Sequence, residues 1–437
     1  MRDGGRLAAA IEVLEAIEEH HKPARLALKA WGDASRHAGA KDRAWVSGLV
    51  LDGLRRRRSL EWRIGQVGPR AVALAALRYD WDWPLERIAE AAGEAAHGPG
   101  PLSEDEARGL AAPRALADAA LDVQGDYPDW LEPHLTRAFG EVRAAELSAL
   151  AHRAPVDLRV NSLKTDPTRT LKALESLGVA SAGLMSAALR APAPAAADRA
   201  APVEAAPEFE RGWFEVQDLG SQVAAAAAGE IKGRQVLDLC AGGGGKTLAL
   251  AAAMGNSGQL YAYDADARRL TDTVRRSQRA GVRNLQVRTP LRNDALAGLE
   301  GRMDVVFVDA PCTGSGTWRR HPDAKWRLRP AQLERRQLEQ DQVLASAAAY
   351  VKPGGRLVYV TCSLLMEENE DRIAAFLAAN PDFAAASALA QIAASGQASV
   401  DGLARLAERQ TPEGYLRLTP ETAATDGFFI AVLERES

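Results

Sequence analysis

The sequence of 437 residues predicts an α/β protein, in which a parallel sheet covered by helices on both faces follows a small α/β module and an all-helical region. Three observations predict this fold class. Apolar residues near the N-terminus recur at helical spacing, short β-type runs begin after about residue 136, and strands alternate with helices after about residue 230. We expect three parts, at 1–135, 136–225 and 226–437.

The first part is expected to be helical because its apolar residues fall on one helix face. The positions with this spacing are Leu7, Ile11, Leu14 and Ile17. The segment Asp42–Val46, continued by Gly53–Arg55, resembles the helical RNA-binding domain of the NusB antitermination factor. The four arginines from Arg55 to Arg58 are either a solvated helix end or part of a basic face for a polyanion.

The middle part changes to short apolar runs such as Asp157–Asn161, followed by a helical stretch near 168–177. An Ala- and Pro-rich tract runs from Ala191 to Pro207. Its composition fits either a flexible linker or a long loop inside a small α/β module.

The third part alternates β-type runs with helical segments, which predicts a Rossmann-like parallel sheet. The expected strands are Gln235–Leu239, Gln259–Tyr263, Asn284–Arg288, Met303–Val308 and Arg356–Thr361. Because such sheets bind ligands at the carboxyl ends of their strands, the residues that follow these strands are the candidates for a site.

Composition and charge exclude several classes of protein. No run of about 18 uncharged apolar residues occurs, so we expect no membrane span. Acidic residues come too early at the N-terminus for a signal peptide, and we expect a cytoplasmic protein and a monomer. The three cysteines form no C-x-x-C pair and no histidine follows at finger-like spacing, so we expect neither a disulfide framework nor a metal.

The net charge of −4 gives no overall attraction for nucleic acid, so such a partner needs a local basic face. One candidate cluster follows the loop that carries Cys312. Its members are Arg319, Arg320, Lys325, Arg327, Arg329, Arg335 and Arg336.

A glycine-rich turn, within Val236–Thr247, joins a buried strand to a helix and lets the backbone approach a ligand closely. It is not a Walker phosphate loop, because Cys240 stands where that pattern needs glycine. It is not a G-x-G-x-x-G dinucleotide turn either, because Thr247 replaces the last glycine. Asp264, about 20 residues further on, suits the ribose of adenosylmethionine or of NAD, or else caps a helix that begins near Ala265.

Two loops at neighbouring strand ends each carry a cysteine. The segment Asp309–Cys312 follows one strand, and Thr361–Ser363 follows the next. A single cysteine is more often an apolar filler than a catalyst. Two thiols and a carboxylate at adjacent strand ends, however, lie where such sheets bind ligands, and this favours a catalytic site.

With these motifs the chain resembles the NOL1/NOP2/Sun family of RNA cytosine-5 methyltransferases, in particular its bacterial Sun (Fmu) branch, which acts on 16S ribosomal RNA. The resemblance covers essentially the whole chain. The segments that carry it are Leu158–Asn161, Val216–Gln222, the glycine turn, Asp309–Cys312, Arg319–Asp323, Lys325–Trp326, Thr361–Ser363, Glu368–Glu370 and Asp426–Phe429. One departure puts cofactor affinity in question, because Gly242-Gly243 stand where the family usually has Ala-Pro.

The resemblance implies an S-adenosylmethionine-dependent enzyme that methylates carbon 5 of cytosine in RNA, expected to be 16S ribosomal RNA. Cys362 is implied to attack carbon 6 of the base, Cys312 to assist release of the adduct, and Asp309 to bond the base edge near N3 as a protonated carboxyl. The implied cofactor-binding residues are Cys240, Ala241, Gly242, Gly243, Gly244, Gly245, Lys246, Asp264, Asp294 and Asp309. The expected substrate-binding residues are Arg319, Arg320, Lys325, Arg159 and Asn161. Lys246 is either a binding residue or a surface lysine at a helix start.

Two other functions compete with this interpretation. A non-catalytic ribosome-assembly factor would keep the fold and bind RNA, but it would not need Cys312, Cys362 and Asp309 together. A DNA cytosine methyltransferase uses the Pro-Cys thiol and is expected to carry a target-recognition insertion, which is not visible after Cys312.

Overall fold

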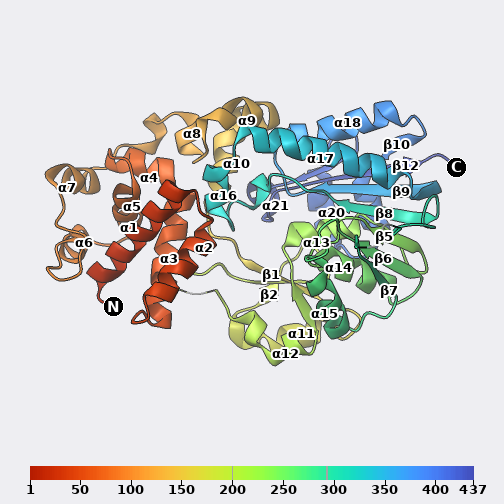
Figure 1. Ribbon diagram of the computed structural model, residues 1–437, viewed down its shortest axis with the longest axis horizontal. Helices are drawn as coiled ribbons and strands as arrows, with labels where there is room; N and C mark the ends of the chain where they lie inside the picture. The colour runs from red at the N-terminus through yellow and green to blue at the C-terminus, as the bar shows by residue number, and fades with distance from the viewer. Residues whose placement is uncertain (199, 292–293) are drawn as a thin grey trace. The chain divides into compact units, whose positions relative to one another are not determined.

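The computed structural model describes residues 1–198, 200–291 and 294–437, and there the chain forms two compact units (Figure 1). The helical unit consists of Met1–Ala154, Ala193–Ala200 and Thr317–Leu328. The sheet unit consists of Pro155–Pro192, Ala201–Gly316 and Arg329–Ser437. The helical unit therefore includes a short segment that directly follows the Cys312 loop in the chain.

The helical unit has a core of apolar side chains contributed by most of its helices. Leu7, Ile11, Leu14 and Ile17 are all buried, which confirms the helix predicted there. The helices are α1 (Asp3–His20), α2 (Ala24–Ala34), α3 (Ala40–Arg55), α4 (Arg57–Ile64), α5 (Pro69–Tyr79), α6 (Leu85–Ala92), α7 (Glu104–Ala111), α8 (Leu121–Gln124), α9 (Glu132–Phe139), α10 (Arg143–Leu150) and α16 (Pro322–Arg327). Short 3-10 turns are η1 (Leu116–Asp118), η2 (Asp129–Leu131) and η3 (Gly140–Val142).

The sheet unit begins with a four-stranded antiparallel sheet in the order β2-β3-β1-β4. Its strands are β1 (Val156–Val160), β2 (Ala180–Ser181), β3 (Ala188–Ala191) and β4 (Phe214–Val216), with α11 (Pro167–Ala173), η4 (Glu175–Leu177), η5 (Val203–Ala205) and α12 (Pro207–Glu210) between them. The Ala- and Pro-rich tract leaves β3 and ends at α12. It is therefore a long loop, in which position 199 lies outside the described residues.

The second sheet follows the order β10-β12-β9-β8-β5-β6-β7, with β11 paired to β12. Strands β5 to β9 are parallel, whereas β10, β11 and β12 pair antiparallel. The strands are β5 (Gln235–Asp238), β6 (Gln259–Tyr263), β7 (Leu285–Arg288), β8 (Met303–Asp309), β9 (Val351–Thr361), β10 (Phe383–Ala386), β11 (Leu416–Leu418) and β12 (Phe428–Arg435). The five strands predicted in this region are confirmed, although β9 begins five residues earlier than expected, at Val351.

Helices cover both faces of this sheet, because successive residues of its strands point to opposite sides. Val236, Val305 and Val358 face α13, α14, α19 and α20, whereas Val306 and Leu357 face α17 and α18. The helices are α13 (Leu219–Ala226), α14 (Gly245–Met254), α15 (Leu270–Ala280), α17 (Pro330–Ala348), α18 (Glu370–Ala379), α19 (Ala388–Ala394), α20 (Val400–Ala407) and α21 (Pro420–Ala423), with 3-10 turns η6 (Ser315–Thr317) and η7 (Met366–Glu368).

The strand order reverses direction at β5, which lies between β6 and β8. Ligands of open α/β sheets bind at such a switch point, outside the carboxyl ends of the strands. The glycine turn follows β5, Asp309 ends β8, and Cys362 follows β9, so the fold brings the predicted motifs to one edge of the sheet. In the described part of the chain, no helix is long and apolar enough to cross a membrane.

Candidate active site

The glycine-rich turn leads from β5 into α14. Gly242 and Gly244 adopt φ angles of 52° and 83°, in the left-handed region that favours glycine. A Cβ atom at position 242 would also come within 2.9 Å of a guanidinium nitrogen of Arg269. Glycine at this position, where the resembled family usually has alanine, therefore agrees with the local backbone.

Asp264, which follows β6, holds the glycine turn in place through hydrogen bonds. Its side chain is 5% exposed and accepts the backbone N–H groups of Gly242 and Asp266, both at 2.9 Å. Arg269 pairs with the same carboxylate at 3.1 Å. The next helix, α15, begins only at Leu270, so the alternative in which Asp264 caps a helix near Ala265 is wrong.

Asp238, the last residue of β5, is a site residue that the sequence reasoning missed. It is fully buried, and burial raises its pKa to about 7, although the Thr247 hydroxyl donates to one of its oxygens at 2.6 Å. The other oxygen has no hydrogen-bond partner among the described residues. An acidic residue directly before a glycine-rich turn was the available signal, and its unpaired acceptor suits a ligand that brings a donor.

Lys246 and Asp309 form an ion pair at 2.7 Å between the start of α14 and the end of β8. The lysine side chain is 10% exposed and the aspartate side chain 34%. Burial lowers the pKa of Lys246, but the charges of Asp309 and Cys362 and the hydrogen bond to Asp309 outweigh it, so its pKa is raised. Because Lys246 is largely buried and paired with Asp309, the alternative of a surface lysine at a helix start is excluded.

The two predicted thiols meet. Cys312 Sγ and Cys362 Sγ lie 3.3 Å apart, and neither forms a disulfide. Their hydrogen bond, burial and the negative charge of Glu368 raise the pKa of Cys312 well above its usual value. Cys362 faces the cation Lys246 instead. The two thiols therefore lie in different surroundings, Cys362 beside a cation and Cys312 beside a carboxylate.

The other predicted cofactor residues divide into two groups. Cys240, Ala241, Gly243 and Gly245 belong to the turn, and burial raises the pKa of the Cys240 thiol. Asp294 is exposed after β7 and lines a separate hollow with residues 286–289 and 295. The adjacent positions 292 and 293 lie outside the described residues.

Arg159 and Asn161 are buried by contacts within the sheet unit. They are 6% and 2% exposed. Arg159 donates to the Gln217 side chain at 2.7 Å, and the Asn161 amide donates to the carbonyls of Gly212 and Ala280, each at 2.8 Å. The direct substrate contact predicted for these two residues does not agree with this burial, because their polar groups hold β1 to its neighbours.

Lys325 caps a helix. It is 1% exposed, and its ammonium donates to the carbonyl of Arg55 at 2.9 Å, while the Trp326 indole donates to the carbonyl of Leu54 at 2.6 Å. These carbonyls end α3 and lack partners within the helix. The predicted substrate contact of Lys325 is therefore corrected to a structural role. Burial lowers the pKa of Lys325 to about 8.

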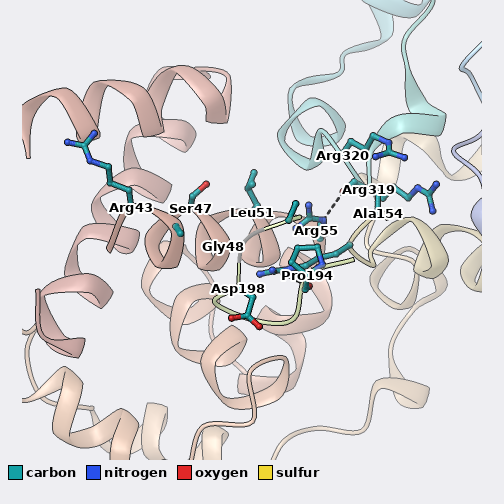
Figure 2. Close-up of a pocket in the computed structure, with 13 residues that line it drawn as sticks. Arg43, Ser47, Gly48, Leu51, Arg55, Ala154, Pro194, Asp198, Arg319 and Arg320 are labelled. Atoms are coloured by element: carbon teal, nitrogen blue, oxygen red, sulfur yellow. Dashed lines mark hydrogen bonds between the residues drawn. The ribbon is translucent and has the colours of Figure 1, made fainter. Parts of the chain in front are cut away.

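Arg319 and Arg320 line a pocket of about 480 Å³ in the helical unit (Figure 2). Arg55 donates to the carbonyl of Arg319 at 2.8 Å at one end of this pocket, and Arg43 lies at the other end. Arg319 is 5% exposed, whereas Arg320 is half-buried. Five arginines line the pocket beside one carboxylate, Asp198, and two of them, Arg55 and Arg153, also pair with Asp52. The arginines are Arg43, Arg55, Arg153, Arg319 and Arg320.

The arginines from Arg55 to Arg58 are neither a solvated helix end nor a continuous basic face. Each pairs with a carboxylate of the helical unit: Arg55 with Asp52, Arg56 with Asp80, Arg57 with Glu18 and Arg58 with Asp122. Their charges are therefore balanced inside the unit.

Comparison with known proteins agrees with this geometry. Residues 228–434 match the family "16S rRNA methyltransferase RsmB/F", and residues 127–194 match the ferredoxin-like domain of RsmF/B-like methyltransferases. The ribosomal RNA small subunit methyltransferase B of Erwinia tasmaniensis is 30% identical over 427 residues, which cover 92% of this chain and 93% of that protein. A probable small subunit methyltransferase B of Synechocystis is 28% identical over 424 residues, covering 90% and 91% of the two chains.

Solved structures show the same fold. The crystal structure of PH0851 superposes with a TM-score of 0.72 at 25% identity, over 100% of this chain and 99% of that one. A methyltransferase homologue from Pyrococcus horikoshii superposes with a TM-score of 0.57 at 27% identity, over 72% of this chain and 97% of that one.

Proposed function

Since the chain belongs to the RsmB/F family of 16S ribosomal RNA methyltransferases, we propose that it methylates carbon 5 of a cytosine in 16S ribosomal RNA with Cys362 as covalent nucleophile. Family membership makes the chain a ribosomal RNA methyltransferase, with S-adenosylmethionine as its cofactor. The position of the methyl group and the roles of the residues are the proposal.

The residues at the glycine turn fit this cofactor. The cofactor supplies a methyl group on a positively charged sulfur. Gly242 and Gly244 leave room for close backbone approach, and Asp264 can accept the ribose hydroxyls. The unpaired oxygen of Asp238 supplies a further acceptor beside the turn. We propose Asp294 as an additional contact to the nucleoside.

The observation that carries the proposal is the 3.3 Å separation of the sulfurs of Cys312 and Cys362. Carbon 5 of cytosine is a weak nucleophile, and addition of a thiolate to carbon 6 pushes electron density onto carbon 5. One thiol is sufficient for that attack. A second thiol in contact with the first is needed only later, when the methylated base is released from Cys362.

Release breaks the C5–H bond and the bond between carbon 6 and Cys362. After carbon 5 has taken the methyl group, its proton leaves to water, and the C–H electron pair forms the double bond between carbons 5 and 6. The bond between carbon 6 and Cys362 Sγ breaks, and its electron pair returns to sulfur as a thiolate. The thiol of Cys312 donates a hydrogen bond to this sulfur and so stabilises the leaving group.

Lys246 Nζ donates to one carboxyl oxygen of Asp309 at 2.7 Å, so this side chain already acts as a hydrogen-bond acceptor. The sequence suggested a donating carboxyl near N3 of the base instead. We propose that Asp309 accepts a hydrogen bond from the exocyclic amine of cytosine, and that Lys246 balances its charge and that of Cys362.

RNA binding is proposed for the parts before the catalytic region. We propose residues 1–135 as a NusB-like RNA-binding domain, 136–225 as a small RNA-binding module and 226–437 as the catalytic domain of a cytoplasmic, monomeric enzyme. The arginine-lined pocket beside Arg320 supports a phosphate contact in the helical unit. The cytosine must leave the base stack to reach the thiols.

The competing function of a non-catalytic assembly factor explains less of the site. A non-catalytic assembly factor gives no reason for two adjacent sulfurs beside a lysine–aspartate pair.

Bisulfite sequencing of 16S ribosomal RNA from a deletion strain tests the proposal. We expect one cytosine to lose its protection and regain it with the wild-type gene but not with Cys362→Ala. Full protection of all modified cytosines in the deletion strain would contradict the proposal.

A further inference from the structure

A buried carboxylate, Glu368, connects the two loops that carry the thiols. Glu368 ends η7 and is 0% exposed. One of its oxygens accepts the backbone N–H of Thr313, the residue after Cys312, at 2.8 Å. Its other oxygen accepts the hydroxyl of Ser363, the residue after Cys362. The carboxylate thus holds the immediate neighbours of both cysteines.

The remaining bonds of Glu368 complete this connection. The Thr313 hydroxyl donates to the same oxygen as Ser363, and the Gln340 amide donates to the other at 3.0 Å. All of these donors are neutral, so they stabilise the carboxylate without cancelling its charge. Burial raises the pKa of Glu368, and these hydrogen bonds oppose that rise. An acidic side chain in such a place costs stability unless its bonds are kept, and a neutral residue would fill the space at lower cost.

Other titratable groups lie around the two thiols. Tyr359 of β9 faces Cys312 from the strand side, and Cys362 contacts it directly. Lys246 faces Cys362, and the Asp341 carboxylate of α17 is paired with Arg372 of α18 at 2.8 Å. Glu368 is an acidic side chain whose negative charge acts on Cys312.

Resting on the proposed function, we propose that Glu368 is a positioning residue that keeps the two sulfurs in contact and holds Cys312 in its thiol form. Cys362 then attacks the base, and Cys312 retains the proton that it needs as a hydrogen-bond donor during release. The residue touches neither cofactor nor substrate in this role.

The test is the pH dependence of iodoacetamide alkylation at each cysteine of the full-length protein, followed by mass spectrometry. In the wild type we expect the midpoint of Cys312 to lie above that of Cys362. Glu368→Gln should make Cys312 react about tenfold faster at pH 8, which corresponds to about one pH unit. Glu368→Asp keeps the charge and should leave the midpoint of Cys312 near the wild-type value.

Glu367→Gln is the matched control, since it removes a neighbouring carboxylate, and it should leave both midpoints unchanged. An unchanged Cys312 midpoint in folded Glu368→Gln, or the same change in Glu368→Asp, would overturn the proposal. If Glu368→Gln does not fold, the wild-type profile decides, because a Cys312 midpoint at or below that of Cys362 overturns it. The assay contains no RNA and no cofactor, so its failure is distinct from a failure of the proposed cytosine chemistry.

Discussion

Lys246 and Lys325 are two largely buried lysines that the structure surrounds in different ways. The Lys246 ammonium bonds a partly exposed carboxylate beside a thiol, and its pKa is raised. The Lys325 ammonium bonds the carbonyl of Arg55, and its pKa is lowered to about 8. A buried cation that pairs with a carboxylate beside a thiol is placed for chemistry, whereas one that bonds the end of a helix stabilises the fold. Substitutions of Lys246 and Lys325 test this difference, and substitutions of Asp264 and Arg320 test the ligand contacts proposed around it.

Replacing Lys246 should have the largest effect on catalysis. We expect Lys246→Met to lower the methylation rate by about 100-fold, because the charges of Asp309 and the Cys362 thiolate lose their balancing cation. Activity lost in this way should recover in part at higher pH, where the thiolate forms without help. Lys352→Met removes the lysine of another aspartate pair, with Asp304, and is the matched control. Equal losses in both variants would show that Lys246 only stabilises the fold.

Asp264→Ala should weaken cofactor binding by about 30-fold, or about 2 kcal/mol, because ribose hydroxyls lose an acceptor in a buried place. Calorimetry with S-adenosylmethionine measures this. Asp266→Ala removes the adjacent exposed carboxylate and should bind normally. If Asp264→Ala also binds normally, the carboxylate only fastens the glycine turn, and the cofactor lies elsewhere.

Lys325→Met should change stability rather than chemistry. The folded-state pKa of Lys325 is about 8 and its ordinary value is 10.5, so between these pH values the unfolded chain binds more protons. The contribution of Lys325 to stability therefore rises with pH in this window and is lost as pH falls through about 8. Urea unfolding at pH 7.5 and pH 9.5 should show the wild type gaining about 1–2 kcal/mol relative to Lys325→Met. A constant difference between the two proteins would mean that Lys325 is not buried in its charged form.

Arg320→Glu should have the smallest effect, on RNA affinity alone. Loss of one phosphate contact lowers the slope of log affinity against log salt by about one unit. Arg108→Glu is the control, because Arg108 is an exposed arginine of the same unit, with 72% of its side chain accessible. Equal slopes for Arg320→Glu and the wild type would remove the pocket from the RNA interface.

The candidate active site could be predicted from the sequence because it is built from strand ends. Asp309, Cys312 and Cys362 follow strands whose β-type runs are continuous in the chain, and parallel strands present these ends at one edge. The ion pair between Lys246 and Asp309 follows from the same geometry. The departure at Gly242 became understandable only with its backbone angle of 52°.

The substrate residues were predicted less well, because burial depends on partners far away in the chain. Lys325 and the Arg55 carbonyl that it bonds are 270 residues apart in sequence. Asn161 bonds the carbonyl of Ala280, 119 residues away. Asp238 and Glu368 were missed for a related reason, because an acidic side chain reveals an unpaired or bridging oxygen only when its surroundings are known.

We propose that the two adjacent sulfurs have opposite roles, which trapping of the covalent adduct can distinguish. RNA from the deletion strain is incubated with cofactor and each cysteine variant, and denaturing gels detect protein bound to RNA. We predict that Cys312→Ala accumulates the adduct, because Cys362 still attacks carbon 6 but is not released, and that Cys362→Ala forms none. An adduct with Cys362→Ala and none with Cys312→Ala would contradict the account, because the Pro-Cys thiol would then be the nucleophile.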